Sequence, residues 1–191
     1  MIEKRQKNST KKAEFKIDTS KPVKLDLGSG LLPYAGKNGD QIEEWIHQDA
    51  HPGNHIEIVC DWEDIPIGSG IVDEVYSSNT IEHIKPWKYD RILGEWNRIM
   101  KPGCKVYITT PNFSWICHLF ANGQMGLQEA LMNIYGDRID EYHNHYVTFT
   151  KETLTETLEK YGFGDIDFSL SPGDPRDPWW LICTFIKIKN L

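Results

Sequence analysis

The sequence is poor in cysteine, in long apolar runs and in basic charge, and each shortage argues against a class of protein. The four cysteines form no Cys-x-x-Cys pair, which argues against a zinc knuckle or redox motif and favours reduced thiols without disulfides. No window reaches the roughly eighteen apolar residues of a membrane span, and the N-terminus lacks the apolar core of a signal peptide. We therefore expect a soluble, cytoplasmic protein.

The overall charge is acidic. The formal net charge is −7, whereas proteins that bind nucleic acids usually carry a basic face. We therefore expect a small-molecule or saccharide partner and no nucleic acid; the sequence does not indicate the oligomeric state. Residues 1–21 are an exception, because basic side chains lie there among Asn, Ser and Thr. A flexible solvated arm is favoured over a nucleic-acid or lipid contact, and a single domain is expected over residues 22–191.

The most informative stretch is Val23–Gly30, an apolar run that ends in a Gly-x-Gly turn. Glycine has no Cβ, so the backbone at Gly28 and Gly30 can adopt positive φ and let a ligand lie against the main chain. In open α/β sheets such ligands bind beyond the carboxyl ends of the strands. A tight turn without a ligand is the alternative, because a short Gly-x-Gly occurs for structural reasons too.

Hydrophobic patterning predicts an α/β fold. Two helices are expected, one over residues 87–100 that stops at Lys101-Pro102-Gly103, and one over residues 150–161. Buried strands are expected at 23–27, 45–48, 56–60, 72–77, 105–110, 165–170 and 181–187. This order predicts a Rossmann-like, doubly wound, seven-stranded sheet that is mostly parallel and ends in an antiparallel hairpin.

Two segments depart from a plain alternation of strands and helices. Residues 31–40 are rich in Pro, Gly and Asn, so a loop or a single turn should replace a long first helix. Residues 113–149 are rich in aromatic residues and are interpreted as a partly helical insertion that covers the active site and shapes the acceptor pocket. Residues 172–178 are interpreted as a rigid loop between the last two strands.

Three positions favour one kind of cofactor: Pro33, where a dinucleotide site would have glycine, and the two aspartates Asp49 and Asp61. A dinucleotide fingerprint needs a third glycine where this chain has Pro33, so two phosphates would lack a helix start to meet them. S-adenosylmethionine has no phosphate and is compatible with this change. Asp49 follows the second strand, where a carboxylate can accept both ribose hydroxyls. Asp61 follows the third strand and could accept from the adenine, with Trp62 or Ile65 covering the base, although capping or turn roles remain open.

At this point the sequence resembles the class I S-adenosylmethionine-dependent methyltransferases. The similarity covers about residues 23–111: Leu-Asp-Leu-Gly-Ser-Gly resembles the first motif of the family, residues 72–84 its fourth-strand motif ending in Glu-His, and residues 96–104 its Lys-Pro-Gly turn. The resemblance implies S-adenosylmethionine as the cofactor. The cofactor-binding residues that the patterns and the resemblance together indicate are Asp26, Gly28, Ser29, Gly30, Asp49, Ala50, Asp61, Trp62 and Asn79.

The chain is similar, more closely, to small predicted methyltransferases found among cell-surface polysaccharide genes and in some phages, which share the shortened first helix and a segment like residues 142–150. These features favour methyl transfer to a small molecule or glycan, chiefly at oxygen. A non-catalytic S-adenosylmethionine-binding or assembly protein and a nicotinamide-dependent sugar-modifying enzyme are the alternatives.

Histidines are the candidate catalytic residues, because a base that titrates near neutrality can remove a proton from a hydroxyl or amine acceptor. His83 follows the fourth strand, although it could instead only brace its loop. His143 and His145 alternate, so in an extended loop they would face the same way. No metal site is expected: a metal would need a third ligand that the sequence does not identify, with Glu141 and Asp140 as the candidates, and lining of the acceptor pocket is favoured.

Overall fold

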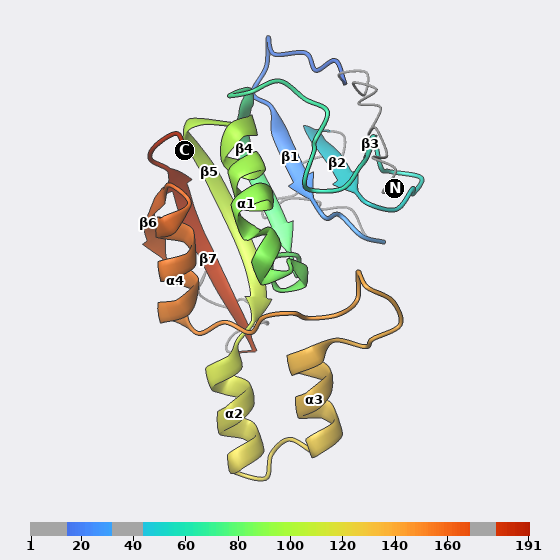
Figure 1. Cartoon of the computed structure of the whole chain (residues 1–191), viewed down its shortest axis with the longest axis vertical. Coiled ribbons are helices and arrows are strands. Elements are labelled where there is room, and N and C mark those ends of the chain that lie inside the picture. Colours follow the sequence, from blue (N-terminus) through green and yellow to red (C-terminus); the bar gives the residue numbers. More distant parts are fainter. Residues whose placement is uncertain (1–14, 32–43, 169–178) are drawn as a thin grey trace, which may run out of the picture.

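The computed structural model describes residues 15–31, 44–168 and 179–191. Its centre is a seven-stranded sheet with the order β3-β2-β1-β4-β5-β7-β6 (Figure 1). The strands are β1 (Lys24–Leu27), β2 (Trp45–Asp49), β3 (Ile58–Val59), β4 (Val72–Ser78), β5 (Met100–Pro111), β6 (Phe163–Asp167) and β7 (Trp180–Lys187). β1 to β5 pair in parallel, while β7 is antiparallel to both β5 and β6. The predicted Rossmann-like, mostly parallel sheet with an antiparallel last hairpin is confirmed.

Two helices cover one face of this sheet, α1 (Tyr89–Ile99) over β4 and β5, and α4 (Lys151–Lys160) beside β6 and β7 (Figure 1). The helix predicted at residues 87–100 therefore begins later. Its first residues form the 3-10 turn η3 (Pro86–Lys88), in which Trp87 is 75% exposed, whereas Trp96 is fully buried. Lys101-Pro102-Gly103 does not form a separate stop, because β5 already begins at Met100. Strand pairing with β4 takes over as soon as the helix ends.

The core lies between the sheet and these helices. Its buried residues include Leu25 and Val75 from central strands and Leu93, Leu154 and Leu158 from α1 and α4. Partly buried Phe15 and Ile17 also pack against this core, and the Phe15 amide donates to the Pro66 carbonyl. Phe15 and Ile17 thus pack against the domain, whereas residues 18–21 are exposed. Residues 1–14 lie outside the described residues, so the flexible arm over residues 1–21 stays a prediction.

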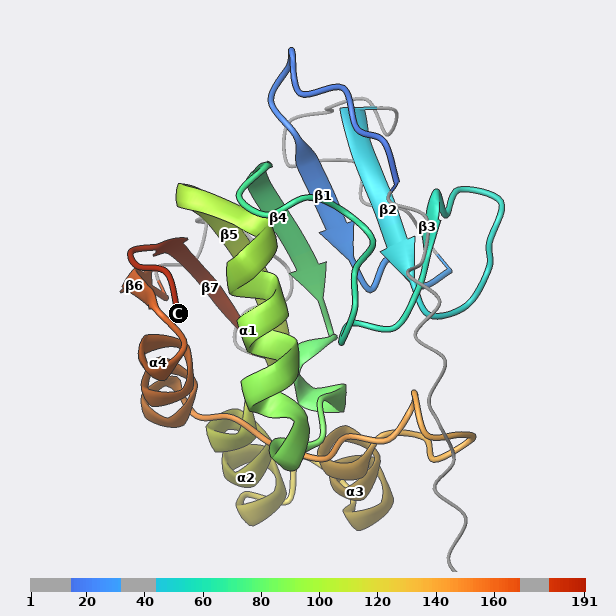
Figure 2. The ribbon, with the colours of Figure 1, turned by 45° about the horizontal axis from the view of Figure 1, so that its top comes forward.

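A helical hairpin interrupts the chain between β5 and α4. It consists of α2 (Phe113–Ala121) and α3 (Leu127–Tyr135), which share a small apolar cluster of their own around Ile116 and Leu119. Figures 1 and 2 show both helices beyond the carboxyl end of β5. The excursion closes where Asn112 and Phe149 form a parallel bridge, so its two ends lie side by side at the edge where the strands end.

Several expectations can be placed along the chain. The third strand is shorter than the predicted residues 56–60, while the expected shortened first helix at 31–40 and the loop at 172–178 lie almost wholly outside the described residues. All four cysteines are free: Cys60, Cys104 and Cys183 are buried and Cys117 is exposed. Among the helices that the structure describes, none is both long and apolar enough to cross a bilayer.

Helix α4 begins at a capping box, which offers a local stability test. The Thr150 side chain accepts from the Thr153 amide, and the Thr153 hydroxyl accepts from the Thr150 amide. We expect Thr150→Ala to lower the free energy of unfolding by about 1 kcal/mol, because two amide donors at the helix start lose part of their pairing. Urea denaturation measures this. Thr155→Ala is the control, since the exposed Thr155 hydroxyl only donates to a carbonyl within the helix; an equal loss in both variants would contradict the capping role.

Candidate functional site

A pocket opens where β1, β2 and β4 end. The loops that follow these three strands line it on one side, and Asp140, Tyr142 and His143 of the segment returning from α3 complete the lining. Figure 2 shows this segment in orange, beyond the ends of the strands. The lining residues are Gly28, Gly30, Leu31, Asp49, Ala50, His51, Pro52, Gly53, Asn54, His55, Trp62, Asn79, Thr80, His83, Asp140, Tyr142 and His143. Because parallel strands end at one edge, residues far apart in sequence meet here.

The glycine turn has two different glycines. Both have positive φ, +70° at Gly28 and +62° at Gly30. A Cβ at Gly28 would lie 2.6 Å from the Thr80 hydroxyl oxygen, whereas a Cβ at Gly30 would meet nothing within 4 Å. The close approach at Gly28 is therefore to a side chain of the protein, and only Gly30 leaves open space for a ligand. The Gln48 carbonyl accepts from the amides of Gly28 and Ser29 and holds the turn in place.

Asp49 connects the glycine turn to the loop after β2. One carboxylate oxygen accepts from the Gly30 amide at 2.9 Å, and the other accepts from the His51 amide at 2.8 Å. Each carboxylate oxygen has a second lone pair, so the side chain can accept further hydrogen bonds at the pocket. Asp49 thus lies at the end of β2 and lines the pocket, and its ribose-binding role stays a prediction.

Two residues of the pocket lining each have a buried ring nitrogen without a hydrogen-bond partner in the described part of the chain. Trp62 Nε1 and His55 Nε2 are buried and have no hydrogen-bond partner among the described residues. Buried polar atoms are rarely left unpaired. Two orphaned polar atoms in the lining, together with the open space at Gly30 and the free acceptor capacity of Asp49, fit a polar ligand such as a nucleoside.

Asp26 and Ser29, which were expected to contact the cofactor, are not among the residues that line the pocket. Asp26 is buried, and its carboxylate lies 3.0 Å from His47 Nδ1. The Ser29 hydroxyl lies 3.3 Å from the same nitrogen. These side chains link β1, β2 and the glycine turn, because Asp26 and His47 are paired neighbours in the sheet. These contacts with His47 hold the glycine turn against β2.

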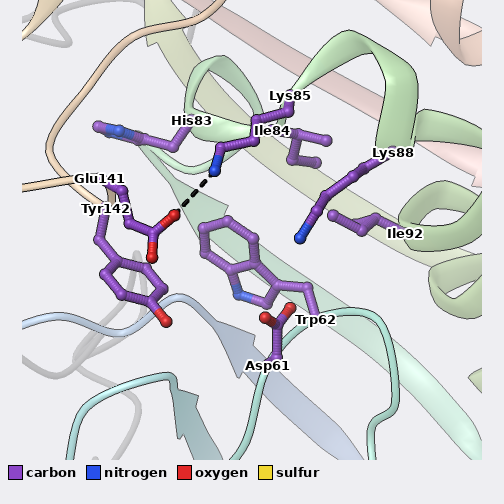
Figure 3. Close-up of a pocket in the computed structure, with 9 residues that line it drawn as sticks. All are labelled: Asp61, Trp62, His83, Ile84, Lys85, Lys88, Ile92, Glu141 and Tyr142. Atoms are coloured by element: carbon purple, nitrogen blue, oxygen red, sulfur yellow. Dashed lines mark hydrogen bonds and ion pairs between the residues drawn. The ribbon is translucent and has the colours of Figure 1, made fainter. Parts of the chain in front are cut away.

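Asp61 lies in a second, smaller pocket that shares Trp62, His83 and Tyr142 with the first (Figure 3). Its carboxylate accepts from the Glu63 amide, which is a turn interaction. Ile65, considered as a cover for the base, is buried in the core instead. Trp62 alone of this group borders both pockets. The ion pair between Lys85 Nζ and Glu141 Oε2, at 2.8 Å, lies along one side of the smaller pocket (Figure 3).

Asn79 follows β4 in a left-handed conformation with a φ of 53°. Asparagine tolerates this conformation better than most residues. Its backbone amide donates to the Thr109 carbonyl, and the residue lines the pocket together with Asp49 and Ala50. Its expected place near the reacting end of the cofactor stays a prediction.

His83 lies at the border of both pockets, in the 3-10 turn η2 (Ile81–His83). Burial, followed by the nearby His145, lowers the pKa of His83 to about 4. The imidazole is therefore neutral at physiological pH and a weak base, which differs from the premise that it titrates near neutrality. Burial also lowers the pKa of His145, which does not line either pocket but packs edge-on against His83 with ring centroids 4.7 Å apart.

His143 lines the larger pocket and has a different partner from His83 and His145. Its Nδ1 lies 2.8 Å from the Asp140 carboxylate, which raises the pKa of His143 above its ordinary value. The same hydrogen bond lowers the pKa of Asp140. His143 and His145 thus have separate environments, although their alternation had suggested a shared one.

Sequence reasoning missed part of the lining. The loop after β2 contributes His51, Pro52 and Asn54 as well as the expected Asp49 and Ala50. Tyr142 stands at the mouth of both pockets, with an edge-on contact to the His51 ring at 4.6 Å. The glycine and asparagine in this loop after a buried strand were an available signal. Nothing local indicated that Tyr142 would meet it.

The sheet order, the glycine turn and the acidic residue at the end of β2 are those of a class I S-adenosylmethionine-dependent methyltransferase. The chain belongs to the methyltransferase-domain family, whose model matches residues 9–167. The expected enzyme class and its cofactor, S-adenosylmethionine, are therefore confirmed, and the nicotinamide alternative is not supported.

The individual relatives are distant. The biotin biosynthesis bifunctional protein BioHC of Cellvibrio japonicus (strain Ueda107) is 27% identical over 88 residues, which make up 46% of this chain and 15% of that protein. A methyltransferase structure from Archaeoglobus fulgidus matches with a TM-score of 0.56 and 19% identity, covering 88% of this chain and 87% of that one.

Two further solved structures share the fold. The 1,6-didemethyltoxoflavin-N1-methyltransferase of Burkholderia thailandensis has a TM-score of 0.56 at 16% identity, with 89% of this chain and 73% of that chain covered. A structure from Listeria monocytogenes, described as a S-adenosylmethionine-dependent methyltransferase, has a TM-score of 0.53 at 17% identity, covering 91% and 94%. At these identities the similarity establishes the fold and leaves the acceptor open.

Proposed function

We propose that this enzyme methylates a hydroxyl group of a small molecule or glycan. The observation that carries the proposal is the two-sided pocket: the glycine turn and Asp49 form one wall, and Tyr142 and His143 form the other. The first wall has the features of a cofactor site. The second comes from the segment over residues 113–149, which we propose covers the active site.

On the cofactor side, we propose that the Asp49 carboxylate accepts from the ribose hydroxyls and that Trp62 covers the adenine. The backbone at Gly30 leaves open space for the ligand, and Ala50 and Asn79 complete this wall. When bound, S-adenosylmethionine supplies an electrophilic methyl group on a sulfonium sulfur. The contribution of the protein is then to align the acceptor and exclude water.

On the acceptor side, the His143–Asp140 pair supports oxygen as the methylated atom. A hydroxyl must lose its proton to become a good nucleophile, whereas a neutral amine needs no base to attack. His143 is the histidine of this pocket whose pKa is raised by a carboxylate partner, which makes it a stronger base than an ordinary imidazole. We assign His143 the role of base. His83, neutral and half-buried, would contact the acceptor, and the His145 ring would hold the His83 ring in place through their edge-on contact.

A saccharide is compatible with the aromatic residues at the mouth of the pocket. The faces of aromatic rings favour stacking against the apolar faces of sugars. Tyr142 is 39% exposed and belongs to both pockets. Because Trp62 is assigned to the adenine, the Tyr142 ring is the candidate for such a contact.

The test combines binding and turnover. Calorimetry with S-adenosylhomocysteine should show one binding site, and tritium from labelled S-adenosylmethionine should pass to hydroxyl acceptors in a panel of methyl glycosides, nucleotide sugars and phenols. Each hydroxyl acceptor is paired with its amino analogue. Transfer restricted to the amino analogues would contradict oxygen methylation. Binding without transfer to any member would favour the non-catalytic alternative.

A further inference from the structure

Three potential metal ligands converge beside the pocket. Glu82 and His83 belong to η2, directly after β4, and His145 belongs to the segment that returns from α3. One ligand atom from each lies within 4.8 Å of the other two. The two segments are held together by the backbone, because the amides of Tyr146 and Val147 both donate to the Glu82 carbonyl.

Both imidazoles are oriented by a backbone carbonyl. His83 Nδ1 lies 3.1 Å from the Asn144 carbonyl oxygen, and His145 Nδ1 lies 2.9 Å from the Asn133 carbonyl oxygen. A carbonyl only accepts, so each Nδ1 carries the hydrogen and each Nε2 presents a lone pair. Histidines that bind metals are held in this way, with the second ring nitrogen donating to a carbonyl or carboxylate.

The carboxyl group of Glu82 is half-satisfied, and burial raises its pKa to about 8, so a bound metal ion would displace its proton. The side chain is fully buried; Oε2 accepts from the Thr110 hydroxyl at 3.0 Å, while Oε1 is buried without a hydrogen-bond partner among the described residues. A buried oxygen of this kind is costly unless something pairs with it. A cation held between Glu82 and the two Nε2 atoms would pair with it.

We propose that Glu82, His83 and His145 form a binding site for one divalent first-row transition-metal ion. Two neutral imidazoles and one carboxylate suit Zn²⁺ and its neighbours, while Mg²⁺ and Ca²⁺ prefer oxygen ligands. Three protein ligands leave at least one coordination position open. His83 also borders the pocket, so, if the proposed function holds, the metal site adjoins the place of the acceptor.

This site differs from the one weighed from the sequence. Asp140 and Glu141 were the candidate third ligands beside His143 and His145, and no metal was expected. In the structure the Asp140 carboxylate pairs with His143 and the Glu141 carboxylate pairs with Lys85. The missing ligands come instead from the end of β4, about sixty residues earlier in the chain.

The test measures metal binding directly and needs no acceptor. The full chain is stripped with a chelator, dialysed, and titrated with Zn²⁺ in calorimetry against a competing chelator. Co²⁺ is used in parallel, because its visible absorption reports nitrogen and oxygen coordination. We expect one tight equivalent of Zn²⁺. Failure to bind Zn²⁺ or Co²⁺ at micromolar concentration would overturn the proposal.

Variants locate the site. Glu82→Gln and His145→Ala should each weaken Zn²⁺ binding by at least about tenfold, since each removes one of three ligands. His118→Ala is the matched control, because His118 is an exposed histidine of α2 that pairs with Asn122. Its binding should equal that of the unchanged protein. Circular dichroism checks folding, and if Glu82→Gln does not fold, His145→Ala and the unchanged protein carry the test.

The outcomes of these experiments separate the metal site from the proposed function. Retained affinity in both Glu82→Gln and His145→Ala, or its loss in His143→Ala, would place the metal elsewhere and overturn the site. One equivalent of Zn²⁺ lost in the two ligand variants would support it even if no acceptor is ever methylated at oxygen. Conversely, methyl transfer by a protein that binds no metal would overturn only the metal site.

Discussion

Replacing Asp49 by alanine is expected to weaken the binding of S-adenosylhomocysteine by about 1 to 3 kcal/mol, roughly 5- to 150-fold in the dissociation constant. The carboxylate ends β2, lines the pocket and already accepts from the Gly30 and His51 amides. Its removal takes away the acceptor proposed for the ribose hydroxyls and also loosens two loops of the same wall. Isothermal calorimetry gives the constant.

The design separates these two effects. Asp49→Asn keeps one oxygen that can accept from the Gly30 amide, so it should lose less affinity than alanine. Asp64→Ala is the control, since Asp64 is an exposed carboxylate in the loop after β3 and lines neither pocket. A dissociation constant for Asp49→Ala equal to that of the control would refute the ribose-binding role.

Gly28→Ala is expected to destabilise the fold by about 2 to 5 kcal/mol. The first part is conformational, because an alanine in the left-handed region costs about 1 to 2 kcal/mol. The second part is steric: the new Cβ would lie 2.6 Å from the Thr80 hydroxyl, and overpacking of this kind adds about 1 to 3 kcal/mol. Thr80 cannot easily move, because it is buried and its hydroxyl shares its one hydrogen between the Leu27 and Ser78 carbonyls.

Gly30→Ala is the matched comparison. Gly30 has nearly the same φ, but a Cβ there meets nothing within 4 Å. It should therefore carry only the conformational cost of about 1 to 2 kcal/mol. Urea denaturation monitored by tryptophan fluorescence measures both variants. If the two glycine variants lose the same stability, packing against Thr80 does not restrict Gly28.

The sheet was predictable because the relevant signals are local. An apolar run in front of Gly28, and apolar residues at helical spacing such as Leu93 and Trp96, report burial wherever the chain folds. The order of the strands then follows from short connections and the right-handed crossover of parallel strands. The same local signal misplaced Trp87, because helical spacing does not tell a helix from the turn that leads into it.

The candidate site was only partly predictable. Asp49 was found because it follows a strand at the distance where a ribose-binding acid is expected, and it does line the pocket. Asp26 and Asp61 carry similar local patterns, yet one is buried against His47 and the other accepts within its own turn. Sequence position shows that a carboxylate lies near the sheet edge but not which side of the chain it faces.

The sequence by itself determined the sheet, the glycine turn and the acidic residue after the second strand, because each depends on the periodicity and flexibility of neighbouring residues. Only the tertiary structure decided that Thr80 packs against Gly28, that Asp140 pairs with His143, and that His145 reaches Glu82 and His83. These contacts join residues far apart in the chain, and their geometry depends on how the α2–α3 excursion returns to the edge of the sheet.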